Sequence, residues 1–243
     1  MNWLKDEVYI DYKTAAAVLS CTPASAFKTL TSMERDGFLE RHAVGRISVW
    51  STSLAGQIEF MSESDDPLSV FEARVSEITV RHTLAVQLAR LAAEAAGGTD
   101  WKAERSIRRE AAQANKAGMS SPWLKVPDGV ITFAGRRIAV EVERSPKSPK
   151  RYRVIMAEYL QMRRADTVAG VHYVCESPKL AKGLERIFKA TESVLIRGTE
   201  VRLKPEHYAC FEFFDAANWP VKSAQKTVVD DANFEEKSFE KEF

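Results

Sequence analysis

The sequence predicts a mixed fold of α+β or α/β type, in which a small N-terminal unit precedes a larger core with a central mixed sheet flanked by helices. Two apolar patterns predict it: helical spacing followed by a short hairpin near the N-terminus, then alternating helical and strand segments. The composition, 45% apolar and 28% charged, is ordinary for a soluble globular chain. We predict four parts, namely a helix-turn-helix unit with a hairpin (1–61), a linker and connecting helix (62–98), the core (99–225) and an acidic disordered tail (226–243).

Several protein classes are disfavoured by the sequence. No apolar run approaches the roughly 18 residues of a membrane span. Asp6 and Glu7 fall where a signal peptide needs apolar residues. The three cysteines, Cys21, Cys175 and Cys210, are too widely spaced for a zinc knuckle and are expected to be buried thiols. We therefore expect a cytoplasmic protein without a membrane span.

Residues 11–56 predict two helices and a hairpin. The first helix covers residues 13–19, and the second begins after the N-cap Thr22 with Pro23 and ends at Gly37. A strand, a Gly45-Arg46 turn and a second strand follow. The apolar side chains that we expect the second helix to bury are Ala26, Leu30 and Met33. This stretch resembles the winged-helix domains of MarR-like regulators.

The resemblance implies that this unit contacts DNA. The residues on the opposite face of the second helix, together with the tip of the wing, suit phosphates and base edges in DNA. They are Ser25, Lys28, Thr29, Ser32 and Arg46. The alternative is a protein-docking module, which the net negative charge of residues 1–100 favours.

A polar linker, 62–67, leads into a predicted long helix that starts at Asp66-Pro67 and ends at Gly97-Gly98. Its expected inward stripe comprises Phe71, Val75, Ile78, Leu84, Leu88 and Leu91. His82 falls on the same inward side of this predicted helix. It is expected either as a hydrogen-bonded core residue or as a support of the active site.

The next helix is predicted from Thr99 or Asp100 to about Gly118. Its inward side is expected to carry Trp101, Glu104, Ile107 and Ala111. A carboxylate on an apolar stripe needs a partner. For Glu104 that partner is either a nearby arginine or a metal ion.

A strand pair is predicted over 130–133 and 137–143, with its turn at Gly135. This register places Asp128 across from residues 141–142. Strand alternation puts Glu141 and Glu143 on one face and three apolar residues on the other. Neighbouring like charges need neutralisation. The candidates are a divalent cation, Arg137, Arg144 and Lys147.

The remaining core is predicted as a basic helix (149–164), a buried strand (168–175), a helix (179–191) and three strands (194–197, 200–203 and 208–213). Basic residues concentrate in one stretch: 101–164 has 15 basic and 6 acidic residues. A phosphate polymer would therefore be drawn to the segment that holds the carboxylates. A solvated helix face is the alternative reading of this charge.

This order of elements, with its carboxylates, resembles the PD-(D/E)xK fold of restriction endonucleases. Pro127-Asp128 matches the PD motif, Glu141-Val-Glu143 stands at the (D/E)xK position, and Glu104 matches an acidic residue of the first helix. Glu143 stands where the family has its lysine. Lys147 or Lys150 is expected to supply that charge instead, or Glu143 binds a second metal ion.

A narrower resemblance is to the replication–relaxation family, and within it to MobC-type plasmid relaxases. It rests on the ordered set of motifs that follows a winged helix: His82-Thr-Leu, Trp101-x-x-Glu104, Pro127-Asp128, Glu141-Val-Glu143-Arg and Arg151-Tyr152. It implies Mg²⁺- or Mn²⁺-dependent, strand-specific nicking of double-stranded plasmid DNA at a transfer origin. The implied partners are an accessory mobilisation protein and a type IV secretion coupling protein.

We predict Asp128 and Glu141 as primary metal ligands, with Glu104 and Glu143 either completing the shell or binding a second ion. The nucleophile is either an activated water or a tyrosine, with Tyr152 as the candidate. Two other functions stay open: a plasmid regulator whose nuclease domain is degenerate, and a restriction or repair nuclease that makes double-strand breaks.

Overall fold

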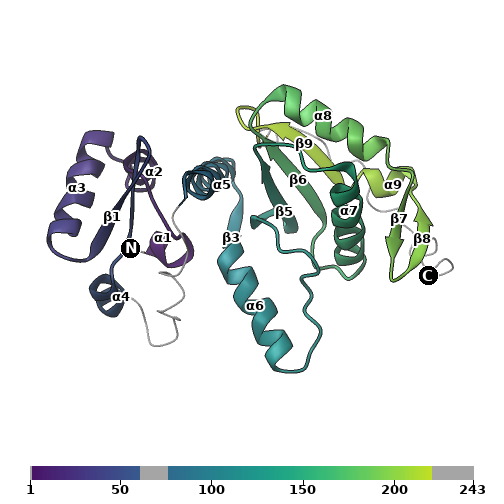
Figure 1. The fold of residues 1–243 in the computed structure, drawn as a ribbon, viewed down its shortest axis with the longest axis horizontal. Coiled ribbons are helices and arrows are strands. Elements are labelled where there is room, and N and C mark those ends of the chain that lie inside the picture. Colours follow the sequence, from purple (N-terminus) through teal and green to yellow (C-terminus); the bar gives the residue numbers. More distant parts are fainter. Residues whose placement is uncertain (1, 61–75, 221–243) are drawn as a thin grey trace.

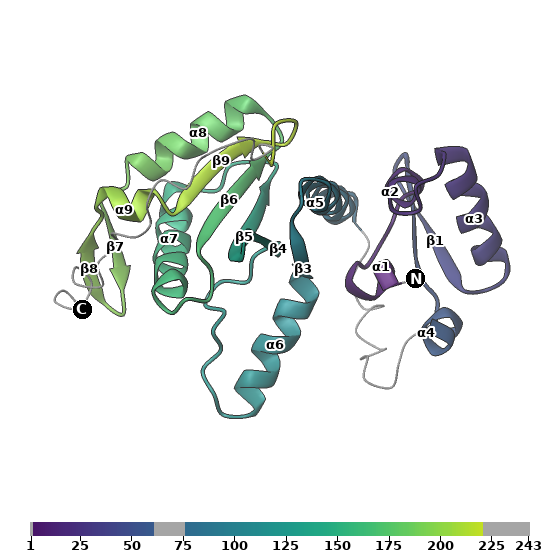
Figure 2. The ribbon, with the colours of Figure 1, turned by 180° about the vertical axis from the view of Figure 1, so that it is seen from behind.

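The structure, a computed structural model, describes residues 2–60 and 76–220. It is a mixed α+β fold with a five-stranded central sheet flanked by helices, which confirms the predicted class at this level (Figure 1). Helix α5 lies between the N-terminal unit and the sheet in both views (Figures 1 and 2). In the described part of the chain, no helix combines the length and the apolar character needed to cross a bilayer.

The N-terminal unit consists of α1 (Asn2–Asp6), α2 (Tyr12–Val18), α3 (Pro23–Arg35), the hairpin strands β1 (Leu39–Val44) and β2 (Ile47–Thr52), and α4 (Leu54–Phe60). Thr22 caps α3 as predicted, accepting the backbone N–H of Ser25 at 3.2 Å. Ala26 and Leu30 are buried against Trp50 of the hairpin. The predicted cap is confirmed, and so is the buried face at Ala26 and Leu30, whereas Met33 is half-buried at its edge. Cys21 is exposed, so the prediction of three buried thiols is wrong for this one.

Helix α5 (Glu77–Ala95) starts later than predicted, because Ser76 has extended backbone and caps it by accepting the N–H of Thr79. The predicted stripe is wrong at two positions, because Ile78 is 80% exposed and Leu88 is 58% exposed, whereas Leu84 and Leu91 are half-buried. The helix packs instead through Val80, Val86, Gln87, Ala89 and Ala93. The physical reason is that α5 has two partners, the N-terminal unit on one side and the sheet on the other, so no single stripe describes it.

The central sheet has the order β3-β4-β5-β6-β9. Its strands are β3 (Thr99–Ala103), β4 (Gly129–Phe133), β5 (Arg136–Glu143), β6 (Gly170–Cys175) and β9 (Phe211–Asp215). The first three pair antiparallel, whereas β5, β6 and β9 run parallel. Helix α5 covers one face. The other face is covered by α6 (Glu104–Lys116), α7 (Pro149–Arg164) and α8 (Pro178–Lys189).

The prediction of a helix starting at Thr99 or Asp100 is wrong. Residues 99–103 form β3, which pairs with β4, and α6 starts at Glu104. Trp101 therefore belongs to a strand, and its indole ring packs over Gly129. A Cβ atom added at Gly129 would lie 2.3 Å from this ring. The regular spacing of apolar residues that suggested one helix spans the end of a strand and the start of a helix.

The predicted β4–β5 hairpin is confirmed. Ala134 and Gly135 both have positive φ, 48° and 78°, as a two-residue turn of type I′ requires. Helix α7 has the predicted bounds. The small sheet of β7 (Ser193–Ile196) and β8 (Thr199–Arg202) is also present, but the predicted strand 208–213 is wrong at its start, because Tyr208 ends α9 (Pro205–Tyr208). The predictions for the linker 62–67, Phe71, Val75 and the tail 226–243 lie outside the described residues.

Candidate functional site

The candidate site is built by the β4–β5 hairpin and the loop before it. The register pairs Gly129 with Val140. Asp128, one residue earlier, therefore comes level with Glu141 on the neighbouring strand. Oδ2 of Asp128 accepts the backbone N–H of Val142 at 2.7 Å. The structure thus brings together the two acidic residues that the sequence predicted as primary ligands.

Asp128 is also held from α5 by His82. Nε2 of His82 lies 3.2 Å from Oδ1 of Asp128. Burial opposes ionisation of Asp128, but the hydrogen bond from His82, the charge of His82 and the N–H of Val142 prevail and lower its pKa. The same hydrogen bond raises the pKa of His82, against the effect of burial. His82 therefore favours the ionised form of Asp128.

Glu141 has the opposite electrostatic character. Its side chain faces α7 and is buried, and burial raises its pKa to about 7, with a further contribution from the charge of Asp128. Two donors limit this rise: the hydroxyl of Tyr159 and the ammonium of Lys125, whose Nζ lies 2.7 Å from Oε1. Adjacent carboxyl groups whose pKa values move apart are the usual arrangement of an acid–base pair.

The sequence prediction missed Lys125. Its side chain is 20% exposed, and its ammonium also donates to the carbonyl of Val126. Trp123 anchors the loop that contains it, because the indole is buried in the core and its Nε1–H donates to Oε2 of Glu110 at 3.0 Å. A single lysine in an otherwise apolar stretch, Trp123-Leu-Lys-Val-Pro127, was the available signal.

Two tyrosines beside Glu141 were also missed as site residues. Tyr159 reaches it from α7, and a fully buried tyrosine needs a partner for its hydroxyl. Tyr173 stands opposite Glu141 in the β5–β6 register and is completely buried. Its hydroxyl has no hydrogen-bond partner within the described part of the chain. The site therefore contains a buried hydroxyl that could form a further hydrogen bond.

Glu143 lies near this pair but has its own partner. It is buried, and burial raises its pKa, although the hydrogen bond and charge of the Lys147 ammonium oppose the rise. Tyr152 is completely buried, and its hydroxyl accepts the backbone N–H of Lys147 at 3.0 Å. Burial raises the pKa of Tyr152 to about 12. Lys150 is exposed in the first turn of α7. This geometry uses the tyrosine hydroxyl inside the fold rather than presenting it to a substrate.

Glu104 is half-exposed at the start of α6, and its Oε1 lies 2.9 Å from Nε of Arg108. Of the two predicted partners of Glu104, the structure shows the arginine, and the metal ion stays a prediction. Among residues 2–60 and 76–220, no group of three or more His, Cys, Asp or Glu side chains is arranged to hold a metal ion.

The donor set nevertheless suits a hard cation. The Glu141 carboxylate and the Val126 carbonyl already share the Lys125 ammonium, with Asp128 beside them. Mg²⁺ is commonly bound by one or two carboxylates, with water and substrate phosphate as its other ligands. These residues fit such a site, and they do not fit a preformed four-carboxylate cage.

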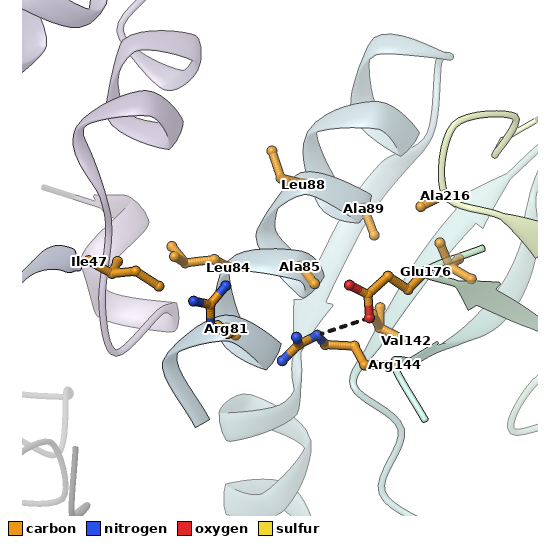
Figure 3. Close-up of a pocket in the computed structure, with 11 residues that line it drawn as sticks. Ile47, Arg81, Leu84, Ala85, Leu88, Ala89, Val142, Arg144, Glu176 and Ala216 are labelled. Carbon is orange, nitrogen blue, oxygen red and sulfur yellow. Dashed lines mark ion pairs between the residues drawn. The ribbon is translucent and has the colours of Figure 1, made fainter. Parts of the chain in front are cut away.

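A cleft of about 390 Å³ lies on the other side of β5 (Figure 3). Leu84 and Leu88 line it from α5, and Arg144 and Glu176 line it from the ends of β5 and β6. Nε of Arg144 lies 3.5 Å from Oε2 of Glu176. Val142 connects the cleft to the site, because its side chain lines the cleft while its N–H bonds Asp128.

The predicted DNA-contacting residues lie on α3 and on the β1–β2 turn. Ser25, Lys28, Thr29 and Arg46 are exposed, and Ser32 is half-buried. A groove along α3 is lined by Lys28, Thr29 and Ser32, together with Phe27, Thr31 and Arg35. The hydroxyl of Ser25 contacts Thr22, and that of Ser32 accepts from Arg35. The structure thus gathers three of the five predicted residues along one groove.

Comparison of the chain with protein-family models, with curated proteins and with solved structures finds no match in any of the three.

Proposed function

We propose that this chain is a metal-dependent endonuclease that nicks one strand of double-stranded plasmid DNA at a transfer origin, as a mobilisation relaxase. The observation that supports it most is the juxtaposition of Asp128, just before β4, and Glu141 on β5. Their pKa values shift in opposite directions, and Lys125 of the preceding loop forms an ion pair with Glu141. The plasmid origin, the accessory mobilisation protein and the coupling protein enter through the family resemblance.

We also propose a fold family for each of the two parts of the chain. Residues 11–56 are proposed to be a winged helix, which the α2–α3–β1–β2 order supports. Residues 99–225 are proposed to be a PD-(D/E)xK core, which is supported by the mixed sheet and by the two carboxylates at the β4–β5 hairpin. The lysine of that motif is replaced here by Glu143.

In the proposed reaction, a bound Mg²⁺ or Mn²⁺ would polarise the scissile phosphate and activate a water. Asp128, whose ionised form His82 favours, and Glu141 would hold the ion. Glu143 is proposed as an outer carboxylate, and Lys147 or Lys150 as the cation that stabilises charge on the phosphate. The buried, hydrogen-bonded hydroxyl of Tyr152 supports water over tyrosine as the nucleophile.

The test uses a supercoiled plasmid that carries the genomic neighbourhood of this gene, incubated with the full chain and Mg²⁺ or Mn²⁺. We expect open circles whose DNA ends are unblocked before protease treatment. Asp128→Asn and Glu141→Gln should abolish nicking, whereas Glu185→Gln, at an exposed pair on α8, should not change it. Full activity in both site variants would reject the site, linear product would indicate a double-strand nuclease, and ends freed only by protease would indicate a tyrosine nucleophile.

A second function is favoured by one observation: Glu104, Glu143 and Tyr152 all have partners inside the protein. A degenerate nuclease domain in a DNA-binding plasmid regulator would show this arrangement. It predicts sequence-specific binding without nicking, and binding that Asp128→Asn leaves unchanged. The same plasmid assay, combined with a mobility-shift measurement, separates the two.

A further inference from the structure

The Lys125 ammonium lies between two oxygen acceptors. It donates to the Glu141 carboxylate, with Nζ 2.7 Å from Oε1, and to the Val126 carbonyl. The Glu141 side chain is 4% exposed and that of Lys125 is 20% exposed, so the pair is largely withdrawn from water. A carboxylate and a backbone carbonyl are also the ligands that Mg²⁺ and Mn²⁺ prefer.

The need for a cation at this place follows from the two carboxylates. Asp128 is close enough to Glu141 for its charge to disfavour ionisation of Glu141, and both side chains are shielded from solvent. His82 compensates Asp128 from α5. Lys125 compensates Glu141 from the loop, and its flexible stem allows the ammonium to leave without unfolding its anchor, Trp123.

A buried hydroxyl without a hydrogen-bond partner in the described part of the chain lies beside Glu141. It belongs to Tyr173, on the neighbouring strand. Such a group needs a water or another polar partner. It is therefore positioned to bond a ligand or a water when the contacts of Glu141 change.

We propose that Lys125 and a divalent cation compete for Glu141: the ammonium neutralises the carboxylate in the DNA-free protein and is released when the cation binds. This inference rests on the metal dependence in the proposed function. It assigns Lys125 as a regulator of metal loading, and it makes the released ammonium available to the DNA phosphate.

The competition is tested by titrating Mn²⁺ into the full-length, DNA-free protein, using calorimetry or the loss of the free-ion electron paramagnetic resonance signal. Lys125→Met removes the competing charge, so we expect it to bind Mn²⁺ about tenfold more tightly than the wild type. Lys125→Arg keeps the charge and should stay near the wild type. Lys189→Met, which removes a lysine from an exposed pair on α8, is the matched control and should leave the affinity unchanged.

A thermal melt gives a second readout and shows that each variant is folded. We expect Lys125→Met to melt below the wild type without metal, because Glu141 loses its partner, and Mn²⁺ to raise its melting temperature more than that of the wild type. Equal or weaker Mn²⁺ binding by folded Lys125→Met would overturn the competition, as would the absence of Mn²⁺ binding in both proteins. Tighter binding by this variant without nicking by the wild type would keep the inference and reject the proposed function.

Discussion

At the scale of single residues, the site depends on how Glu141 is hydrogen-bonded. Burial raises its pKa to about 7, while the hydroxyl of Tyr159 and the ammonium of Lys125 oppose the rise. A carboxyl group with this pKa changes its charge near neutral pH, where a metal ligand must be ionised. Nicking should therefore fall on the acid side of neutrality, as Glu141 becomes protonated.

Tyr159→Phe tests this dependence. Removing the hydroxyl takes away a bond to the charged carboxylate, so we expect the pKa of Glu141 to rise and the acid limb of the nicking profile to move to higher pH. We also expect the free energy of unfolding to fall by about 1–3 kcal/mol, because a buried acceptor loses a donor. Tyr208→Phe is the matched control. The Tyr208 hydroxyl donates to the Thr191 carbonyl at 2.8 Å, and this hydrogen bond does not involve Glu141. An acid limb that does not move would show that Glu141 is not the titrating group.

Gly129 is a second residue with a defined steric role. A Cβ atom there would lie 2.3 Å from the Trp101 ring, next to Asp128. We expect Gly129→Ala to lower the free energy of unfolding by about 1–3 kcal/mol and to reduce nicking, because β3 must shift. Gly183→Ala, on α8 with nothing within 4 Å of the new methyl, should instead be neutral or stabilising. Chemical denaturation of both variants measures the difference, and equal stabilities would contradict the packing argument.

The residues that could be predicted from the sequence are those fixed by local rules. The two-residue turn at Ala134-Gly135 and strand alternation place Asp128 beside Glu141. Lys125 could not be placed, because its contact with Glu141 depends on the path of a loop that Trp123 anchors. That path is determined by tertiary packing and has no periodic signature.

At the scale of elements, too, the features set by local sequence rules could be predicted, and those set by tertiary packing could not. Helix α7 has a cap at Ser148, a proline at its first position and one packed side, and its bounds match the prediction. Helix α5 packs on two sides, and β3 continues directly into α6. Apolar spacing alone therefore gave the wrong stripe for α5 and a helix in place of β3.

The junction between the N-terminal unit and α5 contains a titratable group, Glu7. Nη1 of Arg90 lies 3.4 Å from its carboxylate, and the guanidinium of Arg90 also lies 4.0 Å from the Trp3 ring. Burial raises the pKa of Glu7 to about 7, although Arg90 lowers it. A carboxyl whose pKa is higher in the folded than in the unfolded state stabilises the fold at low pH and loses that contribution as the pH rises through the folded value.

We therefore expect the junction to weaken between about pH 4.5 and pH 8. Glu7→Gln removes this titration, so the stability of the wild type relative to the variant should fall on the order of 2–3 kcal/mol across that interval. Urea denaturation at a series of pH values measures it. Glu94→Gln, which removes the more exposed partner of Arg90, serves as the control and should give a much smaller pH-dependent difference. Parallel curves for wild type and Glu7→Gln would contradict the assignment.

At the scale of the whole molecule, α5 connects the proposed DNA-contacting unit to the site. Its Val80 packs with Tyr9 and Val49, and its Gln87 donates to the Tyr9 carbonyl. Its His82 holds Asp128. The proposed DNA binding and the proposed cutting therefore involve different elements of one packed structure, and we expect them to be separable by substitution.

If Lys28 and Arg46 each contact one phosphate, as proposed, Lys28→Ala and Arg46→Ala should each weaken binding to all duplexes. Each should also reduce the slope of log affinity against log salt concentration by about one. Their nicking should recover at low salt or high protein concentration, because the carboxylates are intact. Asp128→Asn should show the converse, full DNA affinity with an unchanged slope and no nicking. Binding isotherms at several salt concentrations, together with nicking of the same plasmid, measure both. An unchanged salt slope in both α3 and hairpin variants would favour protein docking as the role of this unit, because a docked partner would not release counterions from DNA.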